Sequence, residues 1–550
     1  MAPDQHRFFR SAGVVSAAIS LSRLTGLVRE MAMARLFGAG PANDAFQIAF
    51  RIPNLTRNLF AEGAFSSAFV PVFAQYLTGK GKRQAAELSS VVATALVLVV
   101  GAVCALGMIF SPQLVALLAP GFRAVPGKFE LAVLLTRIMC PFLVLVALAA
   151  QAMGALNACD RFGVPALASA FFNIGSVVFG LALGYTVGRR FHHGLIVSMA
   201  CGVLAGGALQ WLWQVPSLRR AGFAYRPRLD WRHPGLRQIL RLMIPALLGN
   251  AALQINIAVN GNLASGITDA AGRVIDGPVS WLGYAFRFLQ LPLGLFGAAI
   301  SIATLPAVSR SAAAGRMDEF RATLARSLSL AMLLTIPSAV GLAVLGESII
   351  GAIFQGGRFT AYDTHQTAVA LAWYSAGLAG YAAVKILAPA FYALNDGRTP
   401  ALVSVASVGV NLAAAWGLVR WAGMGHAGLA LSTAAVALSA AAALYALMRR
   451  RLGSLRGRML AANAAKIAAA SALMGAVCRA SSLAVHAIAT PERFAHLADI
   501  AVSIPFGAAI FYAAARSLGV PELEALKAAC YTSNSNAPRF ELGDPPPGHR

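Results

Sequence analysis

Apolar stretches of about 20 residues recur along the whole sequence, and no other feature restricts the fold as strongly. They run from Gly13 to Tyr512 and are separated by polar loops. Because a helix needs about 20 residues to cross a bilayer, they predict about fourteen membrane spans. We expect these spans at 12–35, 44–76, 88–111, 130–156, 165–187, 194–215, 236–264, 279–307, 320–346, 365–394, 400–420, 425–448, 460–483 and 497–516.

The pattern predicts an all-α polytopic membrane protein. The chain is 58% hydrophobic and 12% charged, which excludes a soluble globular protein. The alternating ten-residue pattern of membrane barrel strands is absent from the sequence. Pro53 with Gly63, and Pro292 with Gly297, predict a bend or break inside the second and eighth spans.

The formal net charge is +24, from 45 Lys and Arg against 21 Asp and Glu. In a soluble protein this excess would indicate nucleic acid, but here most of it lies in short loops on one side, as the positive-inside rule requires. We therefore expect both termini in the cytoplasm, contact with membrane lipids and no nucleic-acid partner. The basic loops contain Lys80, Lys82 and Arg83, the arginines between 219 and 241, those between 310 and 326, and those between 449 and 458.

An internal repeat divides the chain. Ala49-Phe50-Arg51 recurs as Ala285-Phe286-Arg287, and Ala155-Leu156-Asn157 recurs as Ala393-Leu394-Asn395. Since each repeat has six spans, we expect two six-helix lobes related by a pseudo-two-fold axis along the membrane normal. The predicted divisions are an N-terminal lobe (1–216), a basic amphipathic cytoplasmic linker that forms an interfacial helix (217–238), a C-terminal lobe (239–450), two additional helices (451–520) and a disordered cytoplasmic tail (521–550).

Four arginines lie at membrane depth near the N-terminus: Arg23, Arg29, Arg51 and Arg57. An arginine inside a span costs about 2.5 to 3.5 kcal/mol, so it usually faces a bundle interior or a water-filled cavity. One explanation is that they form ion pairs within the bundle, with Glu30, Asp44 and Glu62. Four arginines against three acids leave a positive surplus, however, and Arg287 adds to it. Because guanidinium forks match phosphate oxygens, the surplus predicts a ligand that carries pyrophosphate.

Helical periodicity places these residues on two faces. Ser22, Gly26, Arg29 and Met33 share the first face, and Arg51, Asn54, Asn58 and Glu62 share the second, with Arg57 adjacent. We expect both faces to line one cavity. In the seventh span, Asn256 and Asn260 lie one turn apart, where they either line this cavity or form interhelical hydrogen bonds.

The residues around these arginines resemble a known family. The stretches SRLTGLVRE and FGAGPANDAFQIAFRIPNLTRNLFAEGAFSSAFVPVF are similar to the MurJ (MviN) family of lipid II flippases, within the multidrug/oligosaccharidyl-lipid/polysaccharide (MOP) exporter superfamily. The resemblance extends through SWLGYAFRFLQLPLGLFGAAISIATLP, IFQGGRFTAYDT and APAFYALNDGRTP. It implies fourteen helices, two lobes around a cationic cavity, and a groove for the polyprenyl tail beside the last two helices.

The resemblance also implies a function. Members move undecaprenyl-pyrophosphate-linked disaccharide pentapeptide from the cytoplasmic to the periplasmic leaflet of the bacterial inner membrane by alternating access, without catalysis or a cofactor. Membrane potential or an ion gradient is a candidate driving force, because a charge that crosses the membrane gains energy from the potential, and cell-wall synthesis proteins are candidate protein partners. By motif position, the essential cavity arginines correspond to Arg23, Arg29, Arg57 and Arg287. Asp44, Arg51 and Glu62 fall on other charged motif positions, and with Glu30 they are candidates for charge pairing and gating.

The sequence departs from the family pattern at two positions near the arginines. Many members carry an acid directly before the eighth-span arginine, as in YADR, whereas this chain has YAFR with Phe286. Arg29 is followed by Glu30 where Asp is common. Some relatives bind sodium through acids in the second lobe, but here Asn256, Asn260 and Asn411 are found instead. We therefore predict no sodium or other metal site.

Two other functions remain as alternatives. A related exporter could carry another lipid-linked oligosaccharide or a drug, although a drug or cation exporter is expected to place carboxylates in its cavity. A polytopic membrane glycosyltransferase would need catalytic acids or histidines on a sizeable outward loop. The acids on such a loop, Asp269 and Asp276, lack an evident partner in the sequence.

Overall fold

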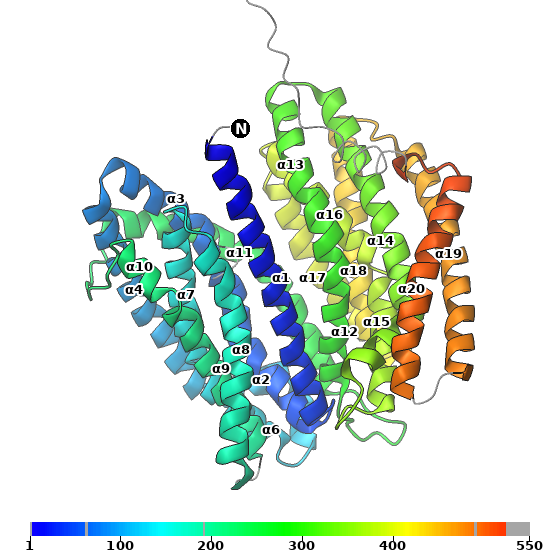
Figure 1. The fold of residues 1–550 in the computed structure, drawn as a ribbon, viewed down its shortest axis with the longest axis horizontal. Helices are drawn as coiled ribbons and strands as arrows, with labels where there is room; N and C mark the ends of the chain where they lie inside the picture. Colours follow the sequence, from blue (N-terminus) through cyan, green and yellow to red (C-terminus); the bar gives the residue numbers. More distant parts are fainter. Residues whose placement is uncertain (1–2, 61–63, 191–192, 489–491, 524–550) are drawn as a thin grey trace, which may run out of the picture. The chain divides into compact units, whose positions relative to one another are not determined.

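The computed structural model describes residues 3–60, 64–190, 193–488 and 492–523. For residues 3–16, 55–60, 64, 189, 245–251 and 253 it describes the backbone alone. Helices make up almost all of the described chain, and most connections are short turns, with longer loops at 221–233 and 266–277 (Figure 1). The predicted tail, 521–550, lies outside the described residues from 524 onward.

Each predicted span falls on a helix or on two consecutive helices. The N-terminal helices are α1 (Pro3–Phe37), α2 (Pro41–Phe60), α3 (Ala64–Gly79), α4 (Lys82–Ile109), α5 (Ser111–Leu118), α6 (Lys128–Met139), α7 (Phe142–Asn157), α8 (Gly163–Thr186), α9 (Gly194–Leu212) and α10 (Val215–Arg220). The later helices are α11 (Pro234–Ser265), α12 (Pro278–Pro292), α13 (Ala298–Ala313), α14 (Met317–Phe354), α15 (Ala361–Ser375), α16 (Leu378–Ala393), α17 (Arg398–Arg420), α18 (Gly425–Leu452), α19 (Gly457–Ile488) and α20 (Glu492–Ser517).

Length and apolar composition identify the membrane-spanning helices. Among the described residues, ten segments are long and apolar enough to cross a membrane, and the bent pair α15 and α16 would add an eleventh. The all-α polytopic class is therefore confirmed. The total of fourteen spans remains a prediction.

The eighth span changes its helical type where a break was predicted. Residues Leu293–Gly297 form a π-helical turn between α12 and α13. Proline lacks an N–H and clashes with the preceding turn, so Pro292 removes one helical hydrogen bond at this point. In the second span, Pro53 lies inside α2, and Gly63 lies outside the described residues.

The linker does not form the predicted interfacial helix. α10 ends at Arg220, and residues 223–230 have no regular structure. The backbone N–H groups of Arg226 and Arg228 donate instead to Ser90 Oγ (3.3 Å) and Thr94 Oγ1 (3.2 Å) of α4. Pro227 explains the difference, because a residue that precedes proline is driven toward an extended conformation.

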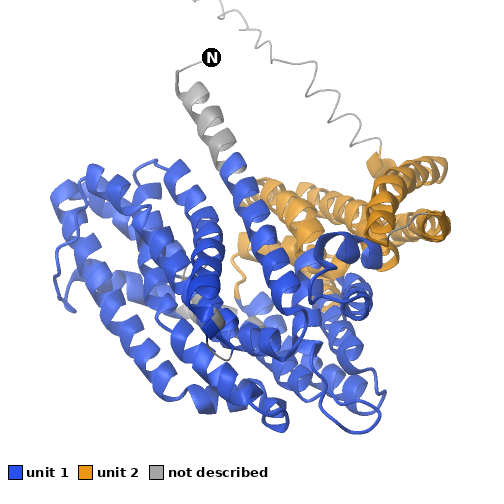
Figure 2. Ribbon diagram, turned by 60° about the horizontal axis from the view of Figure 1, so that its bottom comes forward, with its two compact units in different colours: residues 1–289, 346–377, 398–440 blue, residues 290–345, 378–397, 441–550 orange. Residues whose placement is uncertain are grey.

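The chain forms two compact units (Figure 2). Unit 1 contains residues 1–289, 346–377 and 398–440. Unit 2 contains residues 290–345, 378–397 and 441–550. The repeat predicts two lobes separated by the linker at 217–238. The compact units do not test this division, because they are defined by packing and the lobes are defined by sequence similarity, so the division remains a prediction.

Close helix packing within unit 1 forms the wall that faces α1. α8 runs beside both α1 and α9 (Figure 1). A Cβ atom on Gly202 would lie 2.4 Å from the carbonyl oxygen of Ser176, and one on Gly206 would lie 2.5 Å from that of Phe172. Only glycine permits this approach, as in many membrane helix pairs. Gly202 and Gly206 therefore allow α8 and α9 to pack tightly, and the two helices form one rigid surface.

The turn between α14 and α15 docks on the end of α1 through backbone atoms. Arg358 N donates to Arg35 O at 2.9 Å. Gly38 and Gly357 have φ values of 62° and 61°, in the left-handed region, and a Cβ on either would lie 2.3 Å or less from a carbonyl oxygen of the other segment. Both positions therefore require glycine, and the docked turn closes this end of α1.

Candidate functional site

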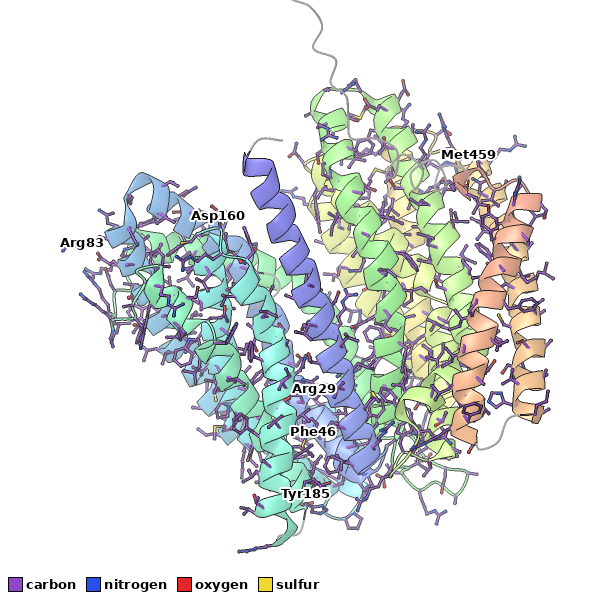
Figure 3. All side chains as sticks on the ribbon, in the orientation of Figure 1. Arg29, Phe46, Arg83, Asp160, Tyr185 and Met459 are labelled. Atoms are coloured by element: carbon purple, nitrogen blue, oxygen red, sulfur yellow. The ribbon has the colours of Figure 1, made fainter. Side chains whose placement is uncertain are left out.

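Arg29 lies inside unit 1, away from both ends of its helices. Figure 3 shows Arg29 and Phe46 between the end marked by Arg83 and Asp160 and the opposite end marked by Tyr185. The Arg29 guanidinium carbon is 5.3 Å from the ring centre of Phe172 on α8 and 5.8 Å from that of Phe50 on α2. These two rings hold the guanidinium group by cation–π contact.

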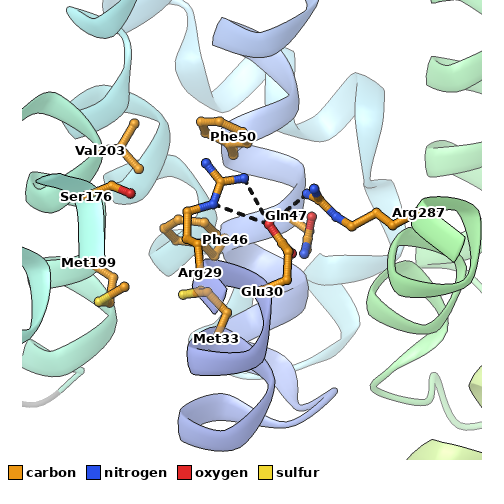
Figure 4. A pocket seen from close by; sticks show the side chains of 10 residues that line it. All are labelled: Arg29, Glu30, Met33, Phe46, Gln47, Phe50, Ser176, Met199, Val203 and Arg287. Carbon is orange, nitrogen blue, oxygen red and sulfur yellow. Dashed lines mark hydrogen bonds and ion pairs between the residues drawn. The ribbon is translucent and has the colours of Figure 1, made fainter. Parts of the chain in front are cut away.

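One carboxylate oxygen bridges two arginines. Glu30 Oε1 is 2.9 Å from Arg29 Nη2 and 2.9 Å from Arg287 Nη2 of α12. Figure 4 shows the two guanidinium groups approaching Glu30 from opposite sides. The Glu30 side chain is 5% exposed and that of Arg29 is 14% exposed, whereas Arg287 is 42% exposed. Two cations against one anion leave a local charge of +1.

A pocket surrounds this triad, and we call it the inner pocket. Its volume is about 20 Å³, which is room for about one water molecule. α8 and α9 supply one wall and α2 the other, while Arg287 reaches in from α12 (Figure 4). The pocket is therefore narrow in this conformation, and Glu30 fills the space between the two guanidinium groups. Its lining consists of Arg29, Glu30, Met33, Phe46, Gln47, Phe50, Ser176, Met199, Val203 and Arg287.

A buried polar layer lies next to the inner pocket along α2. We call it the plug and define it as Asn43, Asp44, Lys128 and Tyr284. Asp44 Oδ2 is 2.9 Å from Lys128 Nζ, and both side chains are 1% exposed. Asn43 Nδ2 donates to the Tyr284 hydroxyl at 2.9 Å. The plug therefore joins α2 to α6 and α12 by charge and hydrogen bonding.

Asp44 also caps a helix. Its carboxylate accepts from the backbone N–H groups of Gly277 (2.9 Å) and Ser280 (3.0 Å), and from the Ser280 hydroxyl (2.6 Å). These donors belong to the first turn of α12, where helical N–H groups lack internal partners. Lys128 Nζ binds a second acid, Asp276, at 2.6 Å. One buried lysine is thus shared by two carboxylates.

The structure brings together part of the predicted site. Of the first predicted face, Arg29 and Met33 line the inner pocket together with Glu30, whereas Gly26 packs against Asn173 of α8 and Ser22 lies outside the lining. Arg23 is exposed on α1 and does not line the pocket. Asn54 is half-buried on α2 and also lies outside the lining.

Arg51 of the second face does not line the inner pocket. Phe46, Gln47 and Phe50 line the pocket from α2, and Arg51 is turned about 100° from Phe50, as consecutive helical residues are. Its guanidinium packs against Gly261 of α11, where a Cβ would meet Nη1 at 2.3 Å. The side chains of Arg57 and Asn58, and all of Glu62, lie outside the described residues.

The asparagines form interhelical hydrogen bonds, the second of the two predicted outcomes. Asn256 Nδ2 donates to Ser407 Oγ (3.3 Å), and Asn260 Nδ2 donates to Thr433 Oγ1 (2.8 Å). Asn411 Nδ2 donates to Asn260 Oδ1 (3.1 Å) and to the backbone carbonyl of Asn256 (3.4 Å), so it links the two bonds. The network connects α11, α17 and α18. Within the described residues, no group of three or more His, Cys, Asp or Glu side chains has the arrangement of a metal site.

The sequence did not reveal the role of Lys128 or the partners of two loop acids. Lys128 stands directly before an apolar stretch, so it has the pattern of an ordinary charge at a span boundary. Asp276 binds Lys128, and Asp269 pairs with Arg273 at 2.9 Å, so both acids do have partners. Hydrogen bonds from the backbone and side chain of Arg273 hold the pKa of Asp269 below its ordinary value.

Comparison with known proteins shows which family has this sequence and fold. The family model described as "Lipid II flippase MurJ" matches residues 33–494. The chain belongs to the MurJ lipid II flippase family. MurJ proteins are transporters, so the chain is a multi-pass membrane transporter and not an enzyme.

Curated MurJ relatives match most of the chain. A probable lipid II flippase MurJ of Vibrio cholerae is 35% identical over 450 residues, which is 80% of this chain and 82% of that protein. The lipid II flippase MurJ of Burkholderia cenocepacia is 34% identical over 447 residues, or 80% of this chain and 84% of that protein.

Solved structures give the same result for the fold. A structure described as lipid II flippase MurJ in an inward closed conformation has a TM-score of 0.73 at 26% identity, and covers 92% of this chain and 99% of its own. An inward-facing multidrug resistance MATE transporter of the MOP superfamily has a TM-score of 0.67 at 14% identity, and covers 81% of this chain and 99% of its own. The second likeness shows a shared fold alone.

Proposed function

We propose that this protein moves lipid II across the bacterial inner membrane from the cytoplasmic to the periplasmic leaflet by alternating access. Family membership supports this substrate. The observation that carries the mechanism is the triad of Arg29, Glu30 and Arg287, which holds a surplus positive charge inside a narrow pocket.

The triad indicates how a pyrophosphate group binds. Each guanidinium can offer a two-pronged donor to phosphate oxygens, and it stays charged when partly desolvated. At present both Arg29 and Arg287 bind the same oxygen of Glu30. A pyrophosphate carries more negative charge and more acceptor oxygens than one carboxylate, so it displaces Glu30 from both arginines. Glu30 therefore neutralises the empty site and is exchanged for substrate.

The small volume of the inner pocket requires a conformational change during transport. A space of about 20 Å³ cannot hold a sugar–pyrophosphate headgroup, so the walls formed by α2 and by α8 and α9 must separate to admit it. On the other side, the plug must open to release it. Alternating access requires that these two openings are never open at the same time.

The orientation follows from the positive-inside rule, with both termini in the cytoplasm. Most of the surplus of 45 Lys and Arg over 21 Asp and Glu lies in loops on that side. The membrane potential is the driving force that fits best, since one charge crossing 100 mV is worth about 2.3 kcal/mol.

Two other functions fit the site less well. A drug or cation exporter needs surplus carboxylate in its cavity, but the inner pocket carries surplus arginine. A glycosyltransferase needs acids free to act on a sugar, yet Asp269 is ion-paired with Arg273 and Asp276 with Lys128. Transport of another lipid-linked oligosaccharide would use the same arginines, so only substrate tests separate it from lipid II.

Complementation of flippase-depleted cells tests the role of the arginines. Copies carrying Arg29→Ala, Arg287→Ala, or Arg29→Ala with Arg57→Ala are expected not to restore growth, because each removes a cation that pyrophosphate needs. Arg228→Ala is the matched control, since Arg228 forms an exposed pair with Glu87 at 2.9 Å and lies on the linker. Normal growth with the Arg29 and Arg57 double variant, at wild-type protein levels, would refute the mechanism.

A further inference from the structure

A second, larger pocket lies in unit 1 on the far side of the plug. We call it the outer pocket, and its volume is about 490 Å³. Three separate segments supply side chains to its walls: His193, then Asp276 and Trp281, then Arg358, Tyr362 and Asp363. The turn between α1 and α2 closes one side of it, at residues 37–42. Asp276 also binds Lys128 of the plug, and none of these residues lines the inner pocket.

The two pockets are neighbours along the same helices. On α1, Met33 lines the inner pocket and Phe37 lines the outer one, a separation of about one helical turn. On α2, Ala42 lines the outer pocket and Phe46 the inner one, with Asn43 and Asp44 of the plug between them. A headgroup that passes the plug from the inner pocket therefore arrives in the outer pocket.

The charges of the outer pocket differ from those of the inner pocket. Asp363 is fully engaged, because it accepts from Trp281 Nε1 (3.0 Å) and from the backbone and hydroxyl of Thr360 (both 3.0 Å). Asp276 uses Oδ1 for Lys128. Arg358 is exposed, and none of the ion pairs found among the described residues includes it. One available cation beside partly available acid oxygens does not suit a polyanion such as pyrophosphate.

The outer pocket also presents aromatic surface. Tyr362 is 60% exposed, and its ring stands edge-on to the buried Trp281 at 5.7 Å between centroids. The bond from Trp281 Nε1 to Asp363 fixes this wall. A rigid aromatic surface next to a few fixed polar groups is typical of sites for small polar ligands with an apolar face, such as sugar rings.

We propose that the outer pocket binds the sugar–peptide part of the lipid-linked headgroup, a polyhydroxylated sugar that carries a carboxylate, after it has passed the plug. Tyr362 stacks against a sugar ring, Asp276 Oδ2 accepts from a hydroxyl, and Arg358 binds the carboxylate. This inference rests on the proposed function. It divides the headgroup between two sites, with pyrophosphate held by the inner pocket and sugar and peptide held by the outer one.

Binding of a water-soluble disaccharide pentapeptide, which lacks pyrophosphate and lipid, tests the outer pocket. The full-length protein in nanodiscs is titrated with this probe. Tyr362→Ala and Arg358→Gln are each expected to weaken binding about tenfold. Both side chains are exposed, so the variants should fold. Tyr225→Ala is the matched control, because Tyr225 is 51% exposed on the linker, and its affinity should equal that of the wild type. No binding by the wild type, or equal binding by all four proteins, overturns the proposal.

A second titration, with inorganic pyrophosphate, tests the division of the headgroup. Arg358→Gln should leave pyrophosphate affinity unchanged, and Arg29→Ala should lower it. If Arg358→Gln lowers it, the outer pocket is an anion site and the sugar assignment is wrong. Suppose that the disaccharide pentapeptide does not bind and that Arg29→Ala still abolishes growth. The outer-pocket inference is then wrong, and the proposed function stands. Normal growth of the Arg29 and Arg57 double variant removes the proposed function itself.

Discussion

Glu30 is the residue on which the candidate site depends most directly. The family resemblance leads one to expect an acid directly before Arg287, but that position is Phe286, whose ring packs edge-on against Tyr374 at 5.5 Å. Glu30, from a different helix, supplies the missing negative charge at 2.9 Å from Arg287. Arg287 is therefore paired with an acid in this structure although no acid stands directly before it in the sequence.

Replacing Glu30 with Gln should lower stability and strengthen anion binding. Breaking a fully buried ion pair costs about 3 to 5 kcal/mol, and since Arg287 is 42% exposed we expect about 2 kcal/mol. Thermal unfolding of the purified protein measures the first effect, and titration with inorganic pyrophosphate measures the second. Glu87→Gln, at an exposed pair, should change neither. Unchanged pyrophosphate affinity in Glu30→Gln would show that Glu30 does not occupy the ligand site.

The plug makes a separate prediction about Asp44 and Lys128. Lys128→Met or Asp44→Asn alone should cost about 3 kcal/mol, because each leaves a buried group without its partner. The double variant should lose less than the sum of the two, with a coupling of about 1 kcal/mol or more. Melting temperatures of the four proteins complete this cycle. Additive losses would mean that the contact at 2.9 Å contributes no coupling.

Sequence reasoning succeeded for residues whose chemistry conflicts with their surroundings. Arg29 stood out because a cation in an apolar helix needs an explanation. Lys128 was missed because a lysine at the start of a span needs none. Arg51 was expected on a cavity-lining face but does not line the inner pocket, since charge and spacing alone do not specify which face of a helix meets which neighbour. Its contact with Gly261 depends on how α11 packs.

At the scale of elements, hydropathy predicted the helices well. Composition gave the wrong structure for the linker, where a proline and hydrogen bonds to another helix control the backbone. The described residues of all fourteen expected ranges lie almost entirely on helices, because length and apolarity are sufficient signals. The linker has the basic and aromatic composition of an interfacial helix, yet Ser90 and Thr94 of α4 hold it extended. Composition carries no information about such long-range partners.

The start of α11 gives a prediction at this scale. His233 is the N-cap residue, and its Nδ1 accepts from Gly235 N at 3.2 Å. Burial lowers the pKa of His233 below its ordinary value. The folded protein therefore favours the neutral ring, and the cap contributes fully above a pH of about 6.5. As pH falls below this value, the contribution, about 1 kcal/mol, is progressively lost.

Melting temperatures between pH 5 and pH 8 measure this effect. His233→Asn should keep the cap and lose the part of the pH dependence that His233 causes, because asparagine caps helices without titrating. His233→Ala should be less stable than the wild type at pH 8, with a smaller difference at pH 5. An identical pH profile in the wild type and His233→Asn would contradict the assignment.

At the scale of the whole molecule, the sequence repeat and the compact units describe different properties. The repeat pairs Arg51 with Arg287, yet Arg287 lines the inner pocket and Arg51 does not. Related positions in two repeats have therefore acquired different surroundings. The family could be recognised from sequence because its motifs are long, whereas the volume of each pocket depends on side-chain packing and could not be predicted.

The central claim is that the arginines of the inner pocket carry lipid II between leaflets, and its most direct test measures where lipid II lies. Outer-leaflet lipid II is assayed in cells depleted of this protein and supplied with plasmid copies. We predict that depletion removes outer-leaflet lipid II, and that wild-type and Arg228→Ala copies restore it while Arg29→Ala and Arg287→Ala copies do not. Unchanged outer-leaflet lipid II after depletion, or full restoration by the Arg29→Ala copy, would contradict the account.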